Sequence, residues 1–221
     1  MNFYPMIKLV AFDLDGTIGD TIPMCITAFK KAVEPFTQHE LSNEEIIQTF
    51  GLNEEGMIKQ VIRNDWGKAL DNFYVVYEKM HVMCPRPLDG ITELIAELKE
   101  KSVFVVLVTG KGEKSCAITL KQFGMETCFD RIDTGSPEKN RKSEAIKDLL
   151  VSYNLRSDEM VYVGDAVSDI TACRKAGVRC LSAAWIVSPE TVPQLEAYNQ
   201  SNVFFSIEAL RDYLRSSFYS I

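Results

Sequence analysis

The chain has 221 residues, of which 46% are hydrophobic and 25% are charged. This composition is typical of a soluble globular protein and excludes a low-complexity or collagen-like chain. The net charge of -7 argues against nucleic acid as a partner, because nonspecific affinity for nucleic acid comes mainly from Lys and Arg side chains that neutralise phosphates. No apolar run approaches the roughly 20 residues that a membrane-spanning helix needs, so we expect no membrane partner either.

The cysteines and histidines form no pattern typical of a metal site. The six cysteines include no C-x-x-C pair and lie in apolar or helical stretches, so free thiols in a reducing compartment fit better than disulfides. His39 and His81 have no partner at metal-ligand spacing. We therefore expect a cytoplasmic protein.

Short apolar runs rich in β-branched residues alternate with stretches of helical spacing along most of the chain. Such alternation is typical of parallel strands joined by crossover helices, and uninterrupted apolar runs indicate strands covered on both faces. The expected fold is therefore an α/β, doubly wound parallel sheet, Rossmann-like in its core. The predicted strands are Ile7–Phe12, Val103–Val108, Met160–Val163 and Val178–Leu181, with further short strands at Phe129–Asp133 and Val203–Phe205.

One segment, residues 21–85, interrupts this alternation. Its apolar residues recur at helical intervals, and it contains no convincing buried strand. It is far too long for a loop between a strand and a helix. We therefore expect a small helical domain inserted after the first strand, hinged near Gly19–Asp20 and Cys84–Pro87. Residues 1–20 and 86–221 would then form the α/β core domain.

The first predicted strand ends in the sequence Phe-Asp-Leu-Asp-Gly-Thr, which contains Asp13 and Asp15. In an extended backbone residues i and i+2 share a face, so both carboxylates can point at one site beyond the end of the strand, where open α/β sheets bind ligands. Gly16 permits a sharp turn that brings backbone N–H groups close to an anion. The alternative, a hairpin turn, is disfavoured because a helical segment follows where a partner strand should be.

Two later segments supply groups that suit a phosphate. The second strand runs into Thr109, Gly110 and Lys111, which place a hydroxyl, a permissive glycine and a cation at the same rim of the sheet. A plain transition from strand to loop gives the same pattern. Lys142 stands at the start of a predicted helix and could reach the anion site, with a solvated basic run as the alternative.

Two more carboxylates, Asp165 and Asp169, follow a strand and are spaced as an i, i+4 pair on one helix face. Carboxylates gathered at one rim would repel each other unless a divalent cation lay among them, and hard oxygen ligands suit Mg²⁺. The sequence thus predicts a Mg²⁺ site formed by Asp13, Asp15, Asp165 and Asp169. The alternative role for Asp165 is a helix N-cap.

Taken in order, Asp-x-Asp-Gly-Thr, Thr-Gly-Lys after an apolar strand, a lysine, and Gly-Asp-x-x-x-Asp resemble the four motifs of the haloacid dehalogenase superfamily. The resemblance covers nearly the whole chain. The insertion between the first two motifs is similar to the helical cap of the branch that includes phosphoglycolate phosphatase-like and β-phosphoglucomutase-like enzymes, which implies a cap domain at residues 21–85.

The resemblance implies a Mg²⁺-dependent phosphatase that hydrolyses a small phosphomonoester through an aspartyl-phosphate intermediate. The small-molecule phosphate ester is then the expected partner. The implied roles are Asp13 as nucleophile, Asp15 as general acid and base, Thr109, Gly110 and Lys142 as phosphate ligands, and Asp165 and Asp169 with the other two aspartates at the Mg²⁺. Lys139 is the alternative to Lys142.

Other reactions remain alternatives on the same motifs. A pyrophosphatase would fit the same core. A dehalogenase in this superfamily attacks carbon and lacks the second aspartate, so Asp15 argues against it. The mutase branch carries a histidine twelve residues after the nucleophile, where this chain has Cys25. A non-catalytic phospho-acceptor module would carry its aspartate on a later strand and would need no helical insertion.

The inserted segment also offers candidates for the entrance of the site. They are the sequence Phe50-Gly51-Leu52, Met57 and Tyr74. Apolar residues at helical spacing more often pack in a core than contact a ligand.

Overall fold

The structure is a computed structural model that describes residues 6–37 and 40–218. His39 and the outermost residues of the predicted core domain lie outside the described residues. A six-stranded sheet has the strand order β3-β2-β1-β4-β5-β6, and every pair of neighbouring strands is parallel. The strands are β1 (Leu9–Phe12), β2 (Phe104–Val108), β3 (Arg131–Asp133), β4 (Met160–Gly164), β5 (Arg179–Ala183) and β6 (Val203–Phe204).

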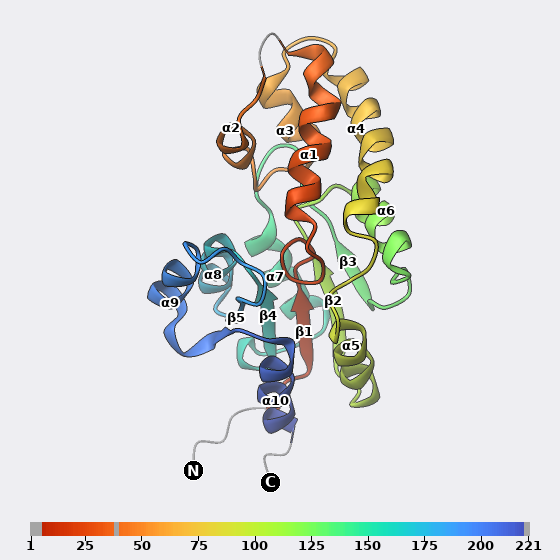
Figure 1. Ribbon diagram of the computed structural model, residues 1–221. Coiled ribbons are helices and arrows are strands. Elements are labelled where there is room, and N and C mark those ends of the chain that lie inside the picture. Colours follow the sequence, from red (N-terminus) through yellow and green to blue (C-terminus); the bar gives the residue numbers. More distant parts are fainter. Residues whose placement is uncertain (1–5, 38–39, 219–221) are drawn as a thin grey trace.

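Helices cover both faces of this sheet (Figure 1). Because successive strand residues point to opposite faces, Val10 and Phe12 belong to one buried cluster, whereas Leu9 and Ala11 belong to the other. The expected doubly wound α/β fold is confirmed. Helices α5 (Ile91–Glu100), α6 (Glu113–Phe123) and α10 (Ile207–Phe218) pack on the first face, and α7 (Lys142–Ser152), α8 (Val167–Ala176) and α9 (Val192–Asn199) pack on the second.

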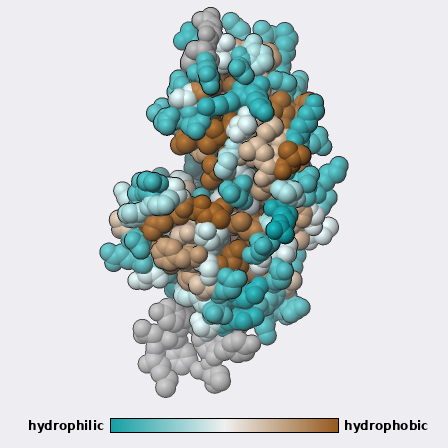
Figure 2. All heavy atoms as spheres, viewed as in Figure 1, coloured by the Kyte–Doolittle hydropathy of each residue, from teal (hydrophilic) through white to brown (hydrophobic). Residues whose placement is uncertain are grey.

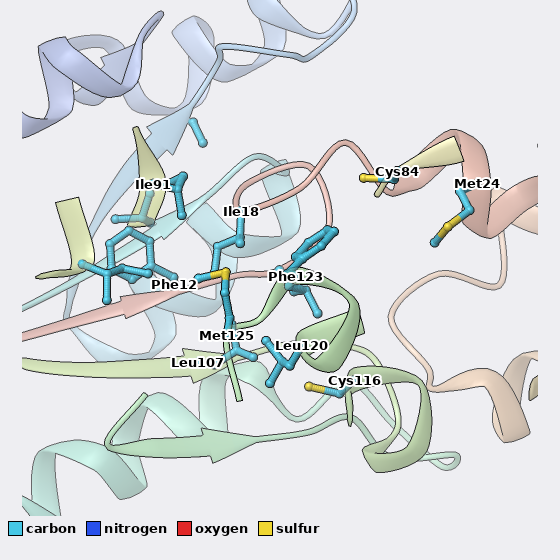
Figure 3. Close-up of a cluster of buried hydrophobic side chains, with 14 of the residues drawn as sticks. Phe12, Ile18, Met24, Cys84, Ile91, Leu107, Cys116, Leu120, Phe123 and Met125 are labelled. Atoms are coloured by element: carbon cyan, nitrogen blue, oxygen red, sulfur yellow. The ribbon is translucent and has the colours of Figure 1, made fainter. Parts of the chain in front are cut away.

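The first cluster supports the loop that follows β1. Phe12 and Leu107 of the central strands lie beside Leu120 and Phe123 of α6 (Figure 3), and full burial of such a side chain contributes about 1.5–3 kcal/mol. A Cβ atom at Gly19 would lie 2.7 Å from the Phe123 ring. The loop after β1 is therefore pressed directly against the core, which fixes the chain where the predicted site begins.

The segment that carries the first four helices after β1 forms a lobe beyond the carboxyl end of the sheet (Figure 1). The rings of Phe29 and Phe73 meet edge to face, with centroids 6.3 Å apart, and Asn72 donates a hydrogen bond to the Ala32 carbonyl at 2.9 Å. These contacts hold the two longest helices of the lobe together. Its helices are α1 (Ile22–Val33), α2 (Asn43–Ile47), α3 (Glu54–Val61) and α4 (Trp66–Met80).

Hydrophobic side chains that reach the surface gather mainly around the middle of the molecule, where the helical lobe meets the sheet layer (Figure 2). The coloured residues at the top of the helical lobe are mostly hydrophilic in this view. Across the described residues, every helix is too short or too polar to traverse a bilayer. The junction of the two lobes is therefore the place where a ligand can be enclosed by side chains from both.

Candidate active site

Asp13 comes directly after β1 and is held by the neighbouring backbone. Its N–H donates to the Val163 carbonyl at 2.8 Å, and its Oδ1 accepts from the Leu14 N–H at 2.8 Å. Oδ2 lies 2.6 Å from Nζ of Lys142, which begins α7. The carboxylate is 6% exposed, so its orientation is fixed by these contacts.

Asp165 approaches Asp13 from the turn after β4, and Asp169 approaches it from the first turn of α8 (Val167–Ala176). Carboxylate oxygens of the three residues all lie within 4.8 Å of one another. The predicted helix-face pairing of Asp165 with Asp169 is wrong, because α8 begins only at Val167 and Asp165 lies in the preceding turn. Asp165 is not the N-cap either. The two meet because Asp169 folds back, accepting from the Ala166 N–H at 3.0 Å.

The electrostatics of this cluster are unfavourable for three anions alone. Burial raises the pKa of Asp13 to about 7, the charges of Asp169 and Asp15 add to this effect, and Lys142 opposes it. Burial also raises the pKa of Asp165, and Asp169 and Asp13 contribute. Burial alone would lower the pKa of Lys142, but Asp13 and Asp169 raise it well above its usual value, so this lysine stays charged and offsets part of the repulsion.

Gly16 permits the close approach of the β1 and β4 loops. Its φ is +75°, and a Cβ atom there would lie 2.2 Å from Oδ2 of Asp165. Thr17 of the same loop donates from its hydroxyl to Oδ1 of Asp165 at 3.4 Å. Any side chain at Gly16 would therefore displace Asp165 from the cluster as well as strain the turn.

The predicted phosphate ligands lie beside the cluster at the same rim. Lys142 contacts Asp169 Oδ1 as well as Asp13, at 2.6 Å, whereas Lys139 forms an exposed ion pair with Glu144. Gly110 lines the cavity that also contains Asp13 and Lys142. Thr109 is buried behind it, where its hydroxyl accepts from the Lys111 N–H at 3.2 Å. The structure thus brings Lys142 and Gly110 to the site directly and Thr109 to its edge.

Asp15 is separated from the three other aspartates. Its Oδ1 accepts from the hydroxyl of Thr21 and lies 3.1 Å from Nζ of Lys111. Sγ of Cys25 lies 3.6 Å from the same oxygen. The side chain is therefore directed toward the helical lobe and lies outside the group that the structure brings within metal-binding distance, in contrast to the predicted ligand set.

A cavity of about 170 Å³ joins these groups at the junction of the two lobes. Its floor holds the carboxylates and lysines of the sheet rim. Phe50, Gly51, Leu52 and Met57 line it, whereas Tyr74 is not among its lining residues. Other lobe residues that line the cavity are mostly apolar: Ile22, Cys25, Phe29, Glu54 and Phe73.

Glu54 is a further buried residue of this junction that the sequence analysis did not identify. Its carboxylate accepts from the Gly112 N–H at 3.0 Å and from the Ser115 hydroxyl, both at the start of α6. Asn53, next to it, donates its N–H to the Ser136 carbonyl at 3.0 Å. These bonds hold the lobe against the sheet layer, and no local motif marks them because the partners are distant in sequence.

Comparisons with known proteins agree with this arrangement. The family model described as haloacid dehalogenase-like hydrolase matches residues 10–183, which span the four motifs. The fold and site define a hydrolase of the phosphatase type, built on a parallel sheet with acidic groups at its carboxyl rim. The chain belongs to the haloacid dehalogenase-like hydrolases.

Curated relatives and solved structures carry similar names. The protein "Putative pyrophosphatase PpaX" of Caldanaerobacter subterraneus subsp. tengcongensis is 31% identical over 83% of this chain and 84% of its own length. Phosphoglycolate phosphatase of Vibrio parahaemolyticus is 29% identical over 77% of this chain and 81% of its length. The crystal structure of "a predicted phosphoglycolate phosphatase" from Haemophilus somnus superposes with a TM-score of 0.76 at 18% identity, covering 96% of this chain and 98% of that one.

Proposed function

We propose that the protein is a Mg²⁺-dependent phosphatase that hydrolyses a small phosphomonoester through an aspartyl-phosphate on Asp13. The observation that carries this proposal is the buried Asp13 carboxylate, which lies 2.6 Å from Lys142 and beside Asp165 and Asp169, and which lines the cavity between the lobe and the sheet. An anion attacking a phosphoryl group needs nearby positive charge, and Lys142 supplies part of it beside Asp13.

The residues fit a divalent cation. Asp13, Asp165 and Asp169 offer hard oxygen atoms within 4.8 Å of one another, which is the donor set that Mg²⁺ prefers. When bound there, the ion would offset the carboxylate charge and the charge that develops on the phosphoryl oxygens. Because Asp15 lies apart from these three residues, we expect three aspartate side chains to bind the ion and not the four that the sequence predicts.

The remaining residues then divide the chemistry. Asp13 attacks the phosphorus atom, and the bond to the leaving oxygen breaks as Asp15 donates its proton to that oxygen. Asp15, now a carboxylate, takes a proton from the water that attacks the aspartyl-phosphate, and phosphate is released. Lys142 stays protonated throughout and offsets charge on Asp13 and on the phosphoryl group.

We further propose that residues 21–85 act as a cap domain over a core formed by residues 1–20 and 86–221. The bonds of Glu54 with Gly112 and Ser115 hold the two parts together, which supports a lobe that closes over the substrate and excludes water. The cavity of about 170 Å³ lies below the roughly 300–1,000 Å³ of sites for drug-sized ligands. A short phosphate ester of the phosphoglycolate type fits it better than a nucleotide.

Two alternatives within the family differ in what happens to the phosphoryl group. A relative named as a pyrophosphatase is 31% identical, so inorganic pyrophosphate is the second candidate substrate. A mutase returns the phosphoryl group to its substrate. Cys25 occupies the position of the mutase histidine, and burial raises the pKa of its thiol to about 12, so it cannot exchange protons as a histidine does near neutral pH.

The proposal is tested by phosphate release from a panel of phosphate esters and pyrophosphate, with Mg²⁺ and with EDTA. We expect Asp13→Asn to abolish turnover while Asp89→Asn, at an exposed aspartate outside the motifs and the cavity lining, leaves it unchanged. Fluoroberyllate should bind only when Asp13 is intact. Full activity of Asp13→Asn, or a phosphorylated residue other than Asp13, would refute the assignment.

A further inference from the structure

Asp15 forms an ion pair with Lys111, a cation of the Thr-Gly-Lys motif to which the resemblance assigns no role. Lys111 Nζ lies 3.1 Å from Oδ1 of Asp15, and its side chain is 6% exposed. Burial alone would lower the pKa of Lys111, but Asp15 raises it well above its usual value. The lysine is therefore a fixed positive charge beside Asp15.

Contacts from the helical lobe hold Lys111 in place. Its Nζ lies 3.2 Å from Sγ of Cys25 and 4.6 Å from the centroid of the Tyr77 ring, where a cation is attracted to the ring face. The Tyr77 hydroxyl is hydrogen bonded to Oγ1 of Thr119 at 2.7 Å, and Nε2 of His81 bonds the same oxygen at 3.0 Å.

This chain of contacts runs from α4 of the lobe to α6 beside the sheet. Tyr77 and Thr119 are fully buried. Water cannot replace the hydrogen bond between their hydroxyl groups, so breaking it would leave buried polar atoms without a partner. The position of the Lys111 ammonium is consequently set by both lobes together. Lys142, the other buried lysine of the cavity, contacts Asp13 and Asp169 and not Asp15.

We propose that Lys111 is a positioning residue that holds Asp15 toward the leaving group and away from the other carboxylates. This inference rests on the proposed phosphatase function. As the bond from phosphorus to the leaving oxygen breaks, its electron pair stays on that oxygen, which takes the proton of Asp15. The Lys111 ammonium then lies beside the new Asp15 carboxylate and offsets its charge until Asp15 accepts a proton from the attacking water.

Comparing two leaving groups distinguishes a role in positioning Asp15 from a purely structural role of Lys111. An alkyl phosphate needs a proton on its leaving oxygen, whereas 2,4-dinitrophenyl phosphate departs as a stable anion without one. General acid catalysis contributes about 10²–10⁴-fold. We expect Lys111→Met to slow first-turnover release of an alkyl alcohol about 100-fold and release of dinitrophenolate less than about 3-fold.

The matched control is Lys114→Met, because Lys114 is an exposed lysine three residues further along, on α6, whose ammonium lies over the Tyr74 ring. It should release both leaving groups at the wild-type rate. Lys111→Gln keeps a hydrogen-bond donor and gives a second, less disruptive variant. We expect it also to slow release of the alkyl alcohol more than release of dinitrophenolate, but by a smaller factor than Lys111→Met. Circular dichroism verifies that each variant is folded.

Equal slowing of both leaving groups in Lys111→Met and Lys111→Gln would overturn the inference, because it would show that Lys111 supports the fold or the phosphoryl group. Unchanged rates with both esters would overturn it as well. Failure of the wild-type protein to release either leaving group would instead refute the proposed function, so the two failures are distinguishable.

Discussion

Replacing Glu54 by alanine removes the main polar contact between α3 and α6. Glu54 accepts hydrogen bonds from the Gly112 N–H and the Ser115 hydroxyl, and α6 has no side-chain cap of its own. Hydrogen bonds to a charged group contribute about 1.5–3 kcal/mol each. Since the variant no longer buries a carboxylate, part of this loss is offset, and we expect a net loss of about 2–3 kcal/mol in the free energy of unfolding.

Thermal unfolding followed by circular dichroism measures this loss. For a chain of this size a loss of 1 kcal/mol lowers Tm by roughly 2–4 °C, so Glu54→Ala should lower Tm by roughly 4–12 °C. Glu55→Ala is the matched control, because Glu55 makes only a partly exposed ion pair with Lys59, worth about 0.3–0.5 kcal/mol. A Tm for Glu54→Ala within about 1 °C of that control would refute the assignment of Glu54 as a buried clamp.

Three further predictions concern the loop, the histidine and the thiol. Gly16→Ala should abolish phosphatase activity while circular dichroism stays native, because its Cβ would collide with Asp165; wild-type kcat would contradict this. Burial lowers the pKa of His81, so the unfolded state binds the proton more readily. As the pH is lowered below about 6.5, the free energy of unfolding of the wild type should therefore decrease more than that of His81→Gln. Urea titration at each pH measures this difference. Because the pKa of Cys25 is raised to about 12, iodoacetamide at pH 8 should modify the half-buried Cys128 before Cys25, as peptide mass mapping would show.

The strands and the order of the motifs along the chain could be predicted because both depend on residues that are close together in the sequence. Uninterrupted apolar runs such as Val105–Val108 occur where a strand is covered on both faces, and the structure confirms this burial. The short β3 is harder to define because it lies at the edge of the sheet, where one neighbour is missing. Its burial is accordingly incomplete.

The structure brings three of the four predicted metal ligands together. Asp13, Asp165 and Asp169 do converge, because the carboxyl ends of neighbouring parallel strands meet at one rim. Asp15 does not join them. Its spacing from Asp13 suggests a shared face, but that argument holds only for extended backbone, and Asp15 lies after β1 has ended.

The sequence by itself determined the alternation of strands and helices, the helical insertion and the residues at each strand end, since all of these depend on neighbours along the chain. Only the tertiary structure decided that Lys111 pairs with Asp15 and that Glu54 meets the start of α6. The direction of a buried charged side chain is set by whichever partner replaces its lost water. Glu54 finds its partners in the opposite lobe, and Cys25 of the helical lobe contacts both Lys111 and Asp15. These contacts are therefore fixed only when the two lobes are packed together.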